Sequence, residues 1–155
     1  MDLKLTGKIA LVKGSTAGIG FAIAKSLASE GAHVYVNGRT QERVDAATAA
    51  IRSHAAAAKV GGIVAYFSGS AGAAAVIAKL PAVDVLVNNV GIFEPKPFAE
   101  IPDADWYRLF EINVRAECGS RDTISQGCWN GTGAVSFSYR ANRGFRFRRK
   151  WCTTE

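Results

Sequence analysis

Short apolar runs alternate with stretches of helical periodicity over the first 114 residues of this 155-residue chain. Apolar runs of about four to eight residues are typical of buried strands, and apolar positions repeated every three or four residues are typical of packed helices. Parallel neighbours need crossovers, so this alternation favours a doubly wound, parallel α/β sheet. The predicted strands are Lys8–Val12, His33–Val36, Val60–Phe67 and Val83–Val87. The predicted helices are Gly18–Glu30, Gln41–Ala58, Gly72–Lys79 (ended by Pro81) and Asp103–Val114, the last anchored in the core by Trp106 and Phe110.

The pattern ends at Arg115. Residues 115–155 have no sustained period of 3.6 or 2 and contain five scattered glycines. We therefore expect the sheet to be truncated after about four strands and followed by an irregular C-terminal tail, disordered or poorly packed. Such a sheet would leave Val83–Val87 as an exposed, aggregation-prone edge strand.

The turn between the first strand and the first helix carries a glycine-rich motif, Gly14-Ser15-Thr16-Ala17-Gly18-Ile19-Gly20. A turn of this kind lets the backbone approach a pyrophosphate and directs the helix N-terminal amides at its charge. We expect Gly14 to allow the tight turn, Gly18 the close approach and Gly20 the packing of helix on strand. Ordinary turns also produce glycine trios, but the strand–turn–helix context supports a dinucleotide site.

The spacing of the three glycines resembles that of the short-chain dehydrogenases/reductases, and the resemblance extends from Leu5 to Val114. Asn88-Asn89-Val90-Gly91 is similar to the family's NNAG motif, and Asn113 matches the asparagine of its catalytic tetrad. The resemblance implies that residues 1–114 form an incomplete NAD(P)-binding, Rossmann-type domain of an oxidoreductase acting on CH–OH groups or carbonyls of small molecules. It also implies a homo-oligomer in intact relatives. The implied cofactor-binding residues are Gly14, Ser15, Thr16, Gly18, Ile19, Gly20, Asn37, Arg39, Asn89, Val90 and Gly91, and the implied catalytic residue is Asn113.

The residues after the second strand favour NADP over NAD. NAD-preferring relatives place an acidic residue there, whereas this chain has Asn37-Gly38-Arg39-Thr40. A guanidinium suits a 2′-phosphate, although Arg39 could instead be a solvated loop charge. Two departures lower the expected affinity. Lys13 stands where the family has threonine, as a defect or as a side chain that reaches toward phosphate, and Tyr66 falls near the position of an adenine-binding aspartate.

The catalytic residues of the family are incomplete in this chain. In the family a tyrosine exchanges the proton, a serine orients the substrate oxygen, and a lysine four residues after the tyrosine lowers the pKa of the phenol. Without such help a phenol titrates near pH 10. No YxxxK is present, because Tyr35, Tyr66, Tyr107 and Tyr139 are followed at that spacing by Arg39, Ser70, Glu111 and Arg143. We therefore expect little or no turnover.

A shifted reading frame accounts for the tail. From Ala116 onward, the third base of each codon joined to the first two bases of the next permits GVRLSRHYLPGMLERNWGRIVFISSESG, followed by (F/L/V)QIPAEMVHYGM. This resembles the family's next helix, its fifth strand ending in serine, and its YG segment. Loss of one base from the methionine codon of an ancestral Asn-Val-Met-Ser-Gly-Val would give the observed residues 113–118. We hypothesise a frameshifted, prematurely terminated dehydrogenase.

The excess of positive charge lies almost entirely in the tail. Residues 1–114 carry eleven Lys/Arg and ten Asp/Glu, whereas residues 115–155 carry eight and three. The basic, aromatic tail leaves a nucleic-acid-binding protein as one alternative, and a non-catalytic NADP-binding remnant as another. The sequence predicts no metal site and no membrane span, since no stretch reaches roughly 18 apolar residues. A cytoplasmic location is expected, with free thiols at Cys118, Cys128 and Cys152.

Overall fold

A computed structural model describes residues 3–66, 70–80, 82–115, 135–140 and 144–149. Its strands are β1 (Ile9–Val12), β2 (His33–Gly38), β3 (Val60–Val64), β4 (Val85–Asn88), β5 (Val135–Arg140) and β6 (Gly144–Arg149). Its helices are α1 (Gly18–Ser29), α2 (Gln41–His54), α3 (Ser70–Lys79) and α4 (Asp103–Phe110), with a 3₁₀ turn η1 (Phe98–Glu100) and a π-helical turn η2 (Glu111–Arg115).

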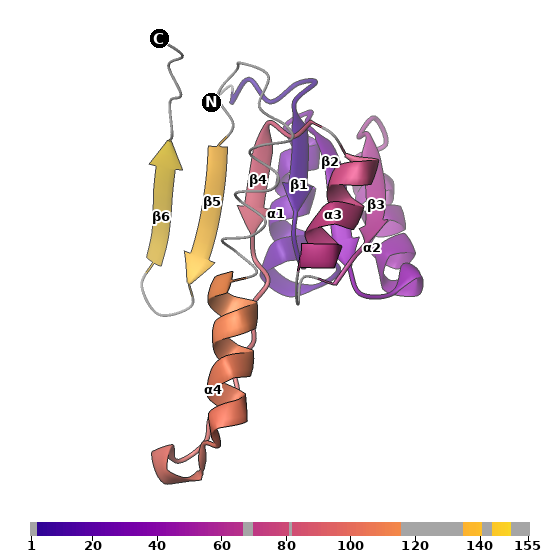
Figure 1. Ribbon diagram of the computed structural model, residues 1–155. Coiled ribbons are helices and arrows are strands. Elements are labelled where there is room, and N and C mark those ends of the chain that lie inside the picture. Colours follow the sequence, from indigo (N-terminus) through magenta and orange to yellow (C-terminus); the bar gives the residue numbers. More distant parts are fainter. Residues whose placement is uncertain (1–2, 67–69, 81, 116–134, 141–143, 150–155) are drawn as a thin grey trace.

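The described strands form one sheet in the order β3-β2-β1-β4-β5-β6 (Figure 1). The pairs up to β4–β5 are parallel, and β6 runs antiparallel to β5. The strand order reverses between β1 and β4, and in open α/β sheets ligands bind beyond the carboxyl ends of the strands at such a point. The fold is therefore the expected Rossmann-type α/β architecture.

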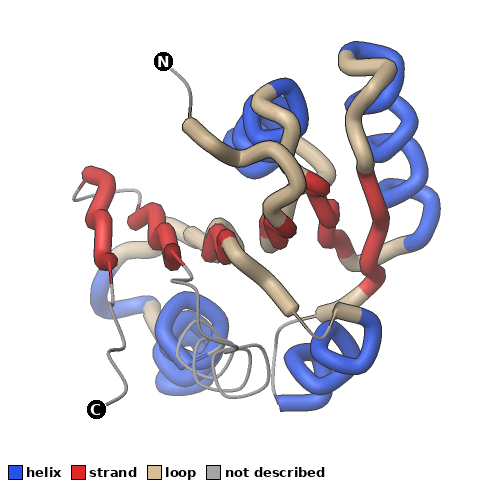
Figure 2. Tube along the Cα trace, turned by 90° about the horizontal axis from the view of Figure 1, so that it is seen from above, coloured by secondary structure: helices blue, strands red, loops and turns tan. Residues whose placement is uncertain are grey.

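Helices cover both faces of the sheet. Figure 2 shows α1 and α2 on one side of the row of strands and α3 on the other. Successive residues of a strand point to opposite faces, so Ala10 and Val12 of β1 pack in the cluster that includes Ala24 and Ile51, while Leu11 packs in the cluster that includes Val76. These two apolar layers explain why the central strands are apolar throughout.

The helix α2 is shorter than its composition predicts. It ends at His54, although the alanines that follow have high helix propensity. The N–H of Val34 bonds the carbonyl of Lys59, at 2.9 Å, so the chain must leave the helix in time to place β3 beside β2. Pairing in the sheet therefore overrides the local preference.

The sheet extends beyond the four predicted strands. β5 pairs in parallel with β4, in the register Val85 to Val135 and Asn88 to Ser138. No strand was expected in residues 115–155, and that expectation was wrong for 135–140 and 144–149, as was the expectation that β4 lies at an edge. Residues 116–134, 141–143 and 150–155, which include the three cysteines, lie outside the described residues, as do Pro81 and Phe67.

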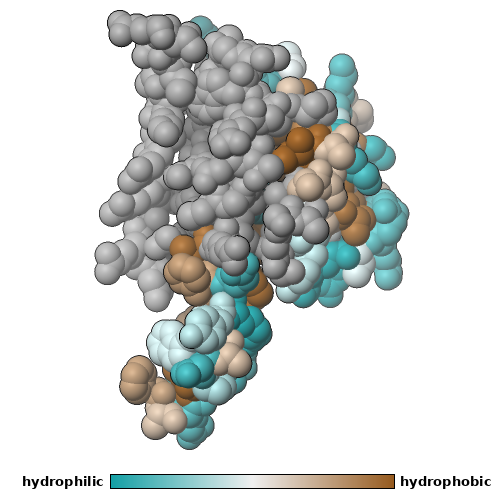
Figure 3. Space-filling view, in the orientation of Figure 1, coloured by the Kyte–Doolittle hydropathy of each residue, from teal (hydrophilic) through white to brown (hydrophobic). Residues whose placement is uncertain are grey.

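The helix α4 projects beyond the carboxyl ends of the strands as an arm (Figure 1). Trp106 and Phe110 are 50% and 58% exposed, so the prediction that they anchor the core was wrong. The amphipathic pattern was correct, but none of the residues of α4 is buried. Figure 3 shows pale and brown surface beside the teal of charged residues on this arm.

Candidate functional site

The glycine-rich loop connects the carboxyl end of β1 to α1. Gly14 and Gly18 have φ values of 60° and 59°, in the left-handed region that glycine adopts readily. A Cβ at Gly20 would overlap the carbonyl of Gly14 and the Nδ2 atom of Asn89. Glycine at position 20 therefore allows α1 to begin directly against the loop, as the sequence predicts.

The N-terminus of α1 is open to an anion. Its N-cap residue is Ala17, no side chain of the described residues caps the helix, and the first turn holds no acidic residue. The first amide groups of a helix lack intrahelical acceptors and carry the positive end of the helix dipole. Around Gly18 a Cβ would meet no atom of the described residues within 4 Å, and Ile19 is 51% exposed. The loop thus fits a phosphate group of a dinucleotide.

Asn37 holds the loop in place. Its side chain is buried, and its Oδ1 atom accepts the N–H of Gly14 at 3.1 Å. Its Nδ2 atom donates to the carbonyls of Ile63 and Ala65, both at 3.1 Å. The backbone N–H of Asn37 donates to Ser15 Oγ at 2.9 Å, and this hydroxyl donates to the carbonyl of Val12 at 2.6 Å. The polar groups of Asn37 and Ser15 therefore contact protein and position the loop.

The residues after β4 contact the same loop. Asn89 Nδ2 donates to the carbonyl of Gly14 at 3.0 Å, and a Cβ at Gly14 would lie 3.2 Å from Cγ2 of Val90. Asn88 is buried, and its Oδ1 atom has no hydrogen-bond partner among the described residues. The NNAG-like segment and the glycine loop thus form one continuous structure at the reversal of strand order.

Lys13 lies directly below the loop and is 1% exposed. Its N–H donates to the carbonyl of Val87 at 3.0 Å, which continues the pairing of β1 with β4. The side chain of Lys13 does not extend to solvent. In this conformation it therefore does not reach toward a phosphate at the surface of the loop. Arg39, in contrast, is exposed just after β2 and forms no ion pair with any residue that the structure describes.

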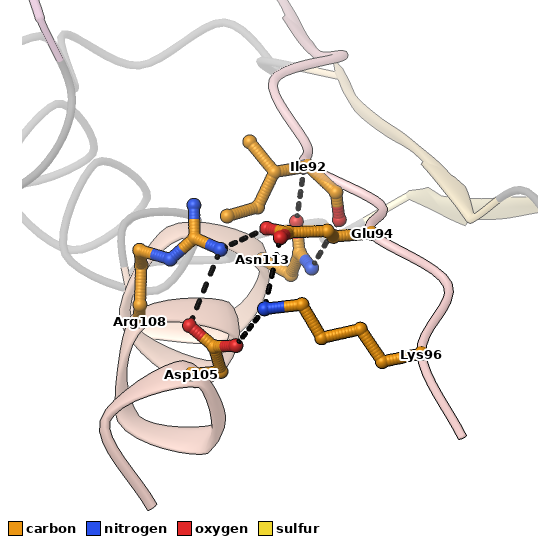
Figure 4. Close-up of polar contacts among 6 residues, drawn as sticks. All are labelled: Ile92, Glu94, Lys96, Asp105, Arg108 and Asn113. Atoms are coloured by element: carbon orange, nitrogen blue, oxygen red, sulfur yellow. Dashed lines mark hydrogen bonds and ion pairs between the residues drawn. The ribbon is translucent and has the colours of Figure 1, made fainter. Parts of the chain in front are cut away.

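Asn113 clamps the segment that follows Gly91 (Figure 4). Its Oδ1 atom accepts the N–H of Ile92 at 2.7 Å, and its Nδ2 atom donates to the carbonyl of Ile92 at 2.9 Å. The π-helical turn η2 at the end of α4 carries Asn113. Both polar atoms of this side chain are thus used to position the backbone of Ile92.

Four charged side chains tie the same segment to α4 (Figure 4). Lys96 Nζ lies 2.6 Å from Asp105 Oδ2 and 3.0 Å from Glu94 Oε1, and Arg108 pairs with Glu94 and Asp105. The hydrogen bond from Lys96, followed by that from Arg108, lowers the pKa of Glu94. The hydrogen bond from Lys96 likewise lowers the pKa of Asp105. All four groups reach solvent, so the network holds the loop without contributing much stability.

None of the four tyrosines is followed by a lysine four residues later. Tyr139, the closest sequence mimic of the catalytic tyrosine, lies in β5, opposite Phe145 of β6. Tyr66 and Tyr107 are 53% and 76% exposed. Arg143 lies outside the described residues.

No helix in the described ranges is long and apolar enough to cross a membrane. No group of three or more His, Cys, Asp and Glu side chains in the same ranges could hold a metal ion.

The fold and the loop are of the kind found in dinucleotide-binding α/β proteins. A sequence model described as short chain dehydrogenase matches residues 8–120, and the chain belongs to this family. It is 46% identical over 114 residues to the uncharacterized oxidoreductase YvaG of Bacillus subtilis, covering 74% of this chain and 43% of that protein. It is 36% identical over 114 residues to gluconate 5-dehydrogenase of Gluconobacter oxydans, covering 72% and 44%.

A solved structure of a related enzyme has the same fold as this chain. L-sorbose reductase from Gluconobacter frateurii, complexed with NADPH and L-sorbose, superimposes with a TM-score of 0.76 at 29% identity, over 82% of this chain and 49% of that protein. The chain thus spans less than half the length of these curated relatives.

Proposed function

We propose that this chain is the NADP-binding part of a short-chain oxidoreductase and that, alone, it binds NADP without turning over a substrate. The observation that carries the proposal is the glycine loop at the uncapped N-terminus of α1, held by Asn37 and Asn89. A relative of the same fold was solved with NADPH. When bound, the nicotinamide ring would exchange a hydride with a carbonyl or an alcohol.

The residues of this chain bind and orient the dinucleotide. The amides at the start of α1 hold the pyrophosphate, and the exposed guanidinium of Arg39 holds the 2′-phosphate. Asn113 fixes the backbone of Ile92 and thereby the segment Gly91–Pro97 beside the loop. These roles account for binding and for positioning, and none of them moves a proton.

Turnover requires a group that exchanges a proton near neutral pH. A phenol titrates near pH 10 unless a neighbouring cation lowers its pKa. The sequence of this chain contains no YxxxK motif. The shifted reading frame after Val114, in contrast, permits a serine-rich run and the YG segment. We therefore attribute the missing chemistry to a change of reading frame at Arg115.

The coding DNA tests this attribution. We expect that insertion of one base at codon 115 restores an open frame that aligns with relatives beyond Val114. An unbroken codon alignment through Arg115 to relatives that share residues 115–155 would exclude the frameshift.

Binding measurements test the cofactor proposal. Arg39→Ala should weaken NADP⁺ binding about tenfold or more and leave NAD⁺ binding unchanged, because it removes a charge-assisted contact to the 2′-phosphate. Arg43→Ala is the matched control, since it removes an exposed arginine four residues further along, in the first turn of α2. Equal losses for both variants would show a general charge effect and contradict the assigned role of Arg39.

Small-molecule carbonyl or alcohol substrates, a homo-oligomer and a cytoplasmic location stay predictions for the whole protein.

A further inference from the structure

The described sheet ends at β6, the last strand in the order β3-β2-β1-β4-β5-β6 (Figure 1). One edge of β6 pairs with β5, and the other edge pairs with no strand of the described sheet. The backbone N–H and C=O groups along such an edge can form hydrogen bonds with a further strand. An extended segment of another molecule can therefore add to the sheet at β6.

The register of β5 and β6 separates aromatic from basic residues. Residues directly opposite each other in an antiparallel pair lie on one face, and successive residues of a strand alternate between the two faces. The aromatic pairs, which share one face, are Phe137 with Phe147 and Tyr139 with Phe145. The pairs on the other face include Ser136 with Arg148 and Ser138 with Arg146. β6 thus alternates phenylalanine and arginine from Phe145 to Arg148, and neither strand contains an acidic residue.

A second copy of β6 is a poor partner for this edge. The antiparallel registers that pair most of β6 with itself and keep the phenylalanines on one face put Arg146 opposite Arg148, or opposite Arg146 of the other copy. Like charges directly opposite each other are destabilising. A slip by one residue would put arginine on the face of the phenylalanines. The arginines therefore disfavour self-association, and charged residues protect the edge strands of natural sheets in the same way.

An acidic strand is a better partner for the same edge. Its acidic residues would take the positions opposite Arg146 and Arg148, and its apolar residues would extend the face of the phenylalanines, so both faces gain favourable neighbours. Nucleic acid that stacks on the aromatic face would share that face with only one arginine of β5 and β6, Arg149, whose register partner is Val135. The separation of the two residue types onto two faces therefore favours a protein strand over nucleic acid.

We propose that the outer edge of β6 is a docking site for an extended acidic segment of a partner protein, in which acidic residues alternate with apolar ones. The segment adds to the sheet as a further strand, with its backbone bonded to β6 and its acidic residues in register with Arg146 and Arg148. β4 and β5 separate β6 from β1, so this site is distinct from the glycine loop and does not depend on the cofactor.

Fluorescence anisotropy of short labelled peptides tests the proposal on the full chain, at about 0.15 M salt so that distant charges are screened. A peptide of alternating valine and glutamate should bind with a Kd below about 100 µM. Two control peptides should bind about tenfold more weakly or less: one with the same residues in a glutamate block and a valine block, and the alternating peptide with N-methylated backbone amides. Equal binding of either control, or no saturable binding of the alternating peptide, would overturn strand addition.

Charge reversal tests the register. Arg146→Glu/Arg148→Glu should weaken binding of the glutamate peptide about tenfold or more and create binding of a peptide of alternating valine and lysine. Arg43→Glu/Lys59→Glu is the matched control, because it makes the same change of charge at exposed positions in α2 and just before β3, at the opposite end of the sheet. It should leave the binding of both peptides unchanged.

Three outcomes of these titrations would contradict the proposal. An equal loss in the two double variants would show a general charge effect, and no gain for the lysine peptide would refute the assigned register. Displacement of the glutamate peptide by oligothymidylate that binds more tightly would assign the site to nucleic acid. The peptide series on the unsubstituted chain remains decisive even if Arg146→Glu/Arg148→Glu does not fold.

Discussion

Replacing Asn37 by alanine removes the side chain that connects three parts of the site. Its Oδ1 atom accepts from Gly14 in the loop, and its Nδ2 atom donates to Ile63 and Ala65 at the end of β3. All three bonds measure 3.1 Å, and Asn37 is 2% exposed. Asn37→Ala leaves the N–H of Gly14 and the carbonyls of Ile63 and Ala65 without these partners, in buried or half-buried positions.

The expected loss follows from the number of bonds. A hydrogen bond within a protein contributes about 1 kcal/mol net, and a buried group left without a partner costs somewhat more. Three such bonds give an expected loss of about 3 kcal/mol in the free energy of unfolding. Asn37→Asp keeps the acceptor but replaces the donor with a buried charge facing two carbonyls, so we expect it to be at least as destabilising.

Urea denaturation followed by circular dichroism measures this loss by linear extrapolation. Gln41→Ala is the control, because its amide donates one exposed hydrogen bond to Asp45, at 2.8 Å, and should change stability by less than about 0.5 kcal/mol. If Asn37→Ala were no more destabilising than Gln41→Ala, the assignment of Asn37 as the structural link between loop and sheet would be refuted.

A further variant and a change of pH test other parts of the site. Asn113→Ala should speed hydrogen exchange at the amide of Ile92, which loses its acceptor; unchanged exchange would exclude the clamp. The pKa values of Glu94 and Asp105 are lowered in the folded state, so their stabilisation is present above their unfolded pKa values of about 4 and is lost as pH falls through the lower folded values. The melting temperature should therefore decrease slightly over that range, and Lys96→Met should flatten the decrease; identical pH profiles would contradict the ion-pair network.

The part of the fold that the sequence predicts is the part governed by local periodicity. The strand–turn–helix unit around Gly14 and the crossover units that follow combine apolar spacing with turn residues, and the structure has these elements in the predicted order. A helix ends earlier than predicted where pairing in the sheet determines the path of the backbone, as it does after His54. β5 was missed although Val135–Arg140 alternates apolar and polar residues, because this run is short and its partner β4 is far away in the sequence.

The site was predictable as a set of residues but not as a set of contacts. The glycines indicate a phosphate-binding turn by type and spacing. The sequence cannot reveal that Asn37 faces inward, because an asparagine at the end of a strand can equally face a ligand. The packing of Thr16 against Gly38 was also hidden, since these two residues are distant in the sequence. Trp106 and Phe110 were assigned to the core by their amphipathic spacing, and spacing does not reveal whether another element covers them.

A single fluorescence experiment on the 155-residue chain tests most directly whether it binds dinucleotide without proton-transfer chemistry. NADPH is titrated into the protein, and a panel of carbonyl compounds is then added to the saturated sample. We predict a saturable change in NADPH fluorescence, followed by no steady loss of the reduced cofactor. Steady oxidation of NADPH after the carbonyl is added, or no saturation up to about 1 mM NADPH, would contradict this interpretation.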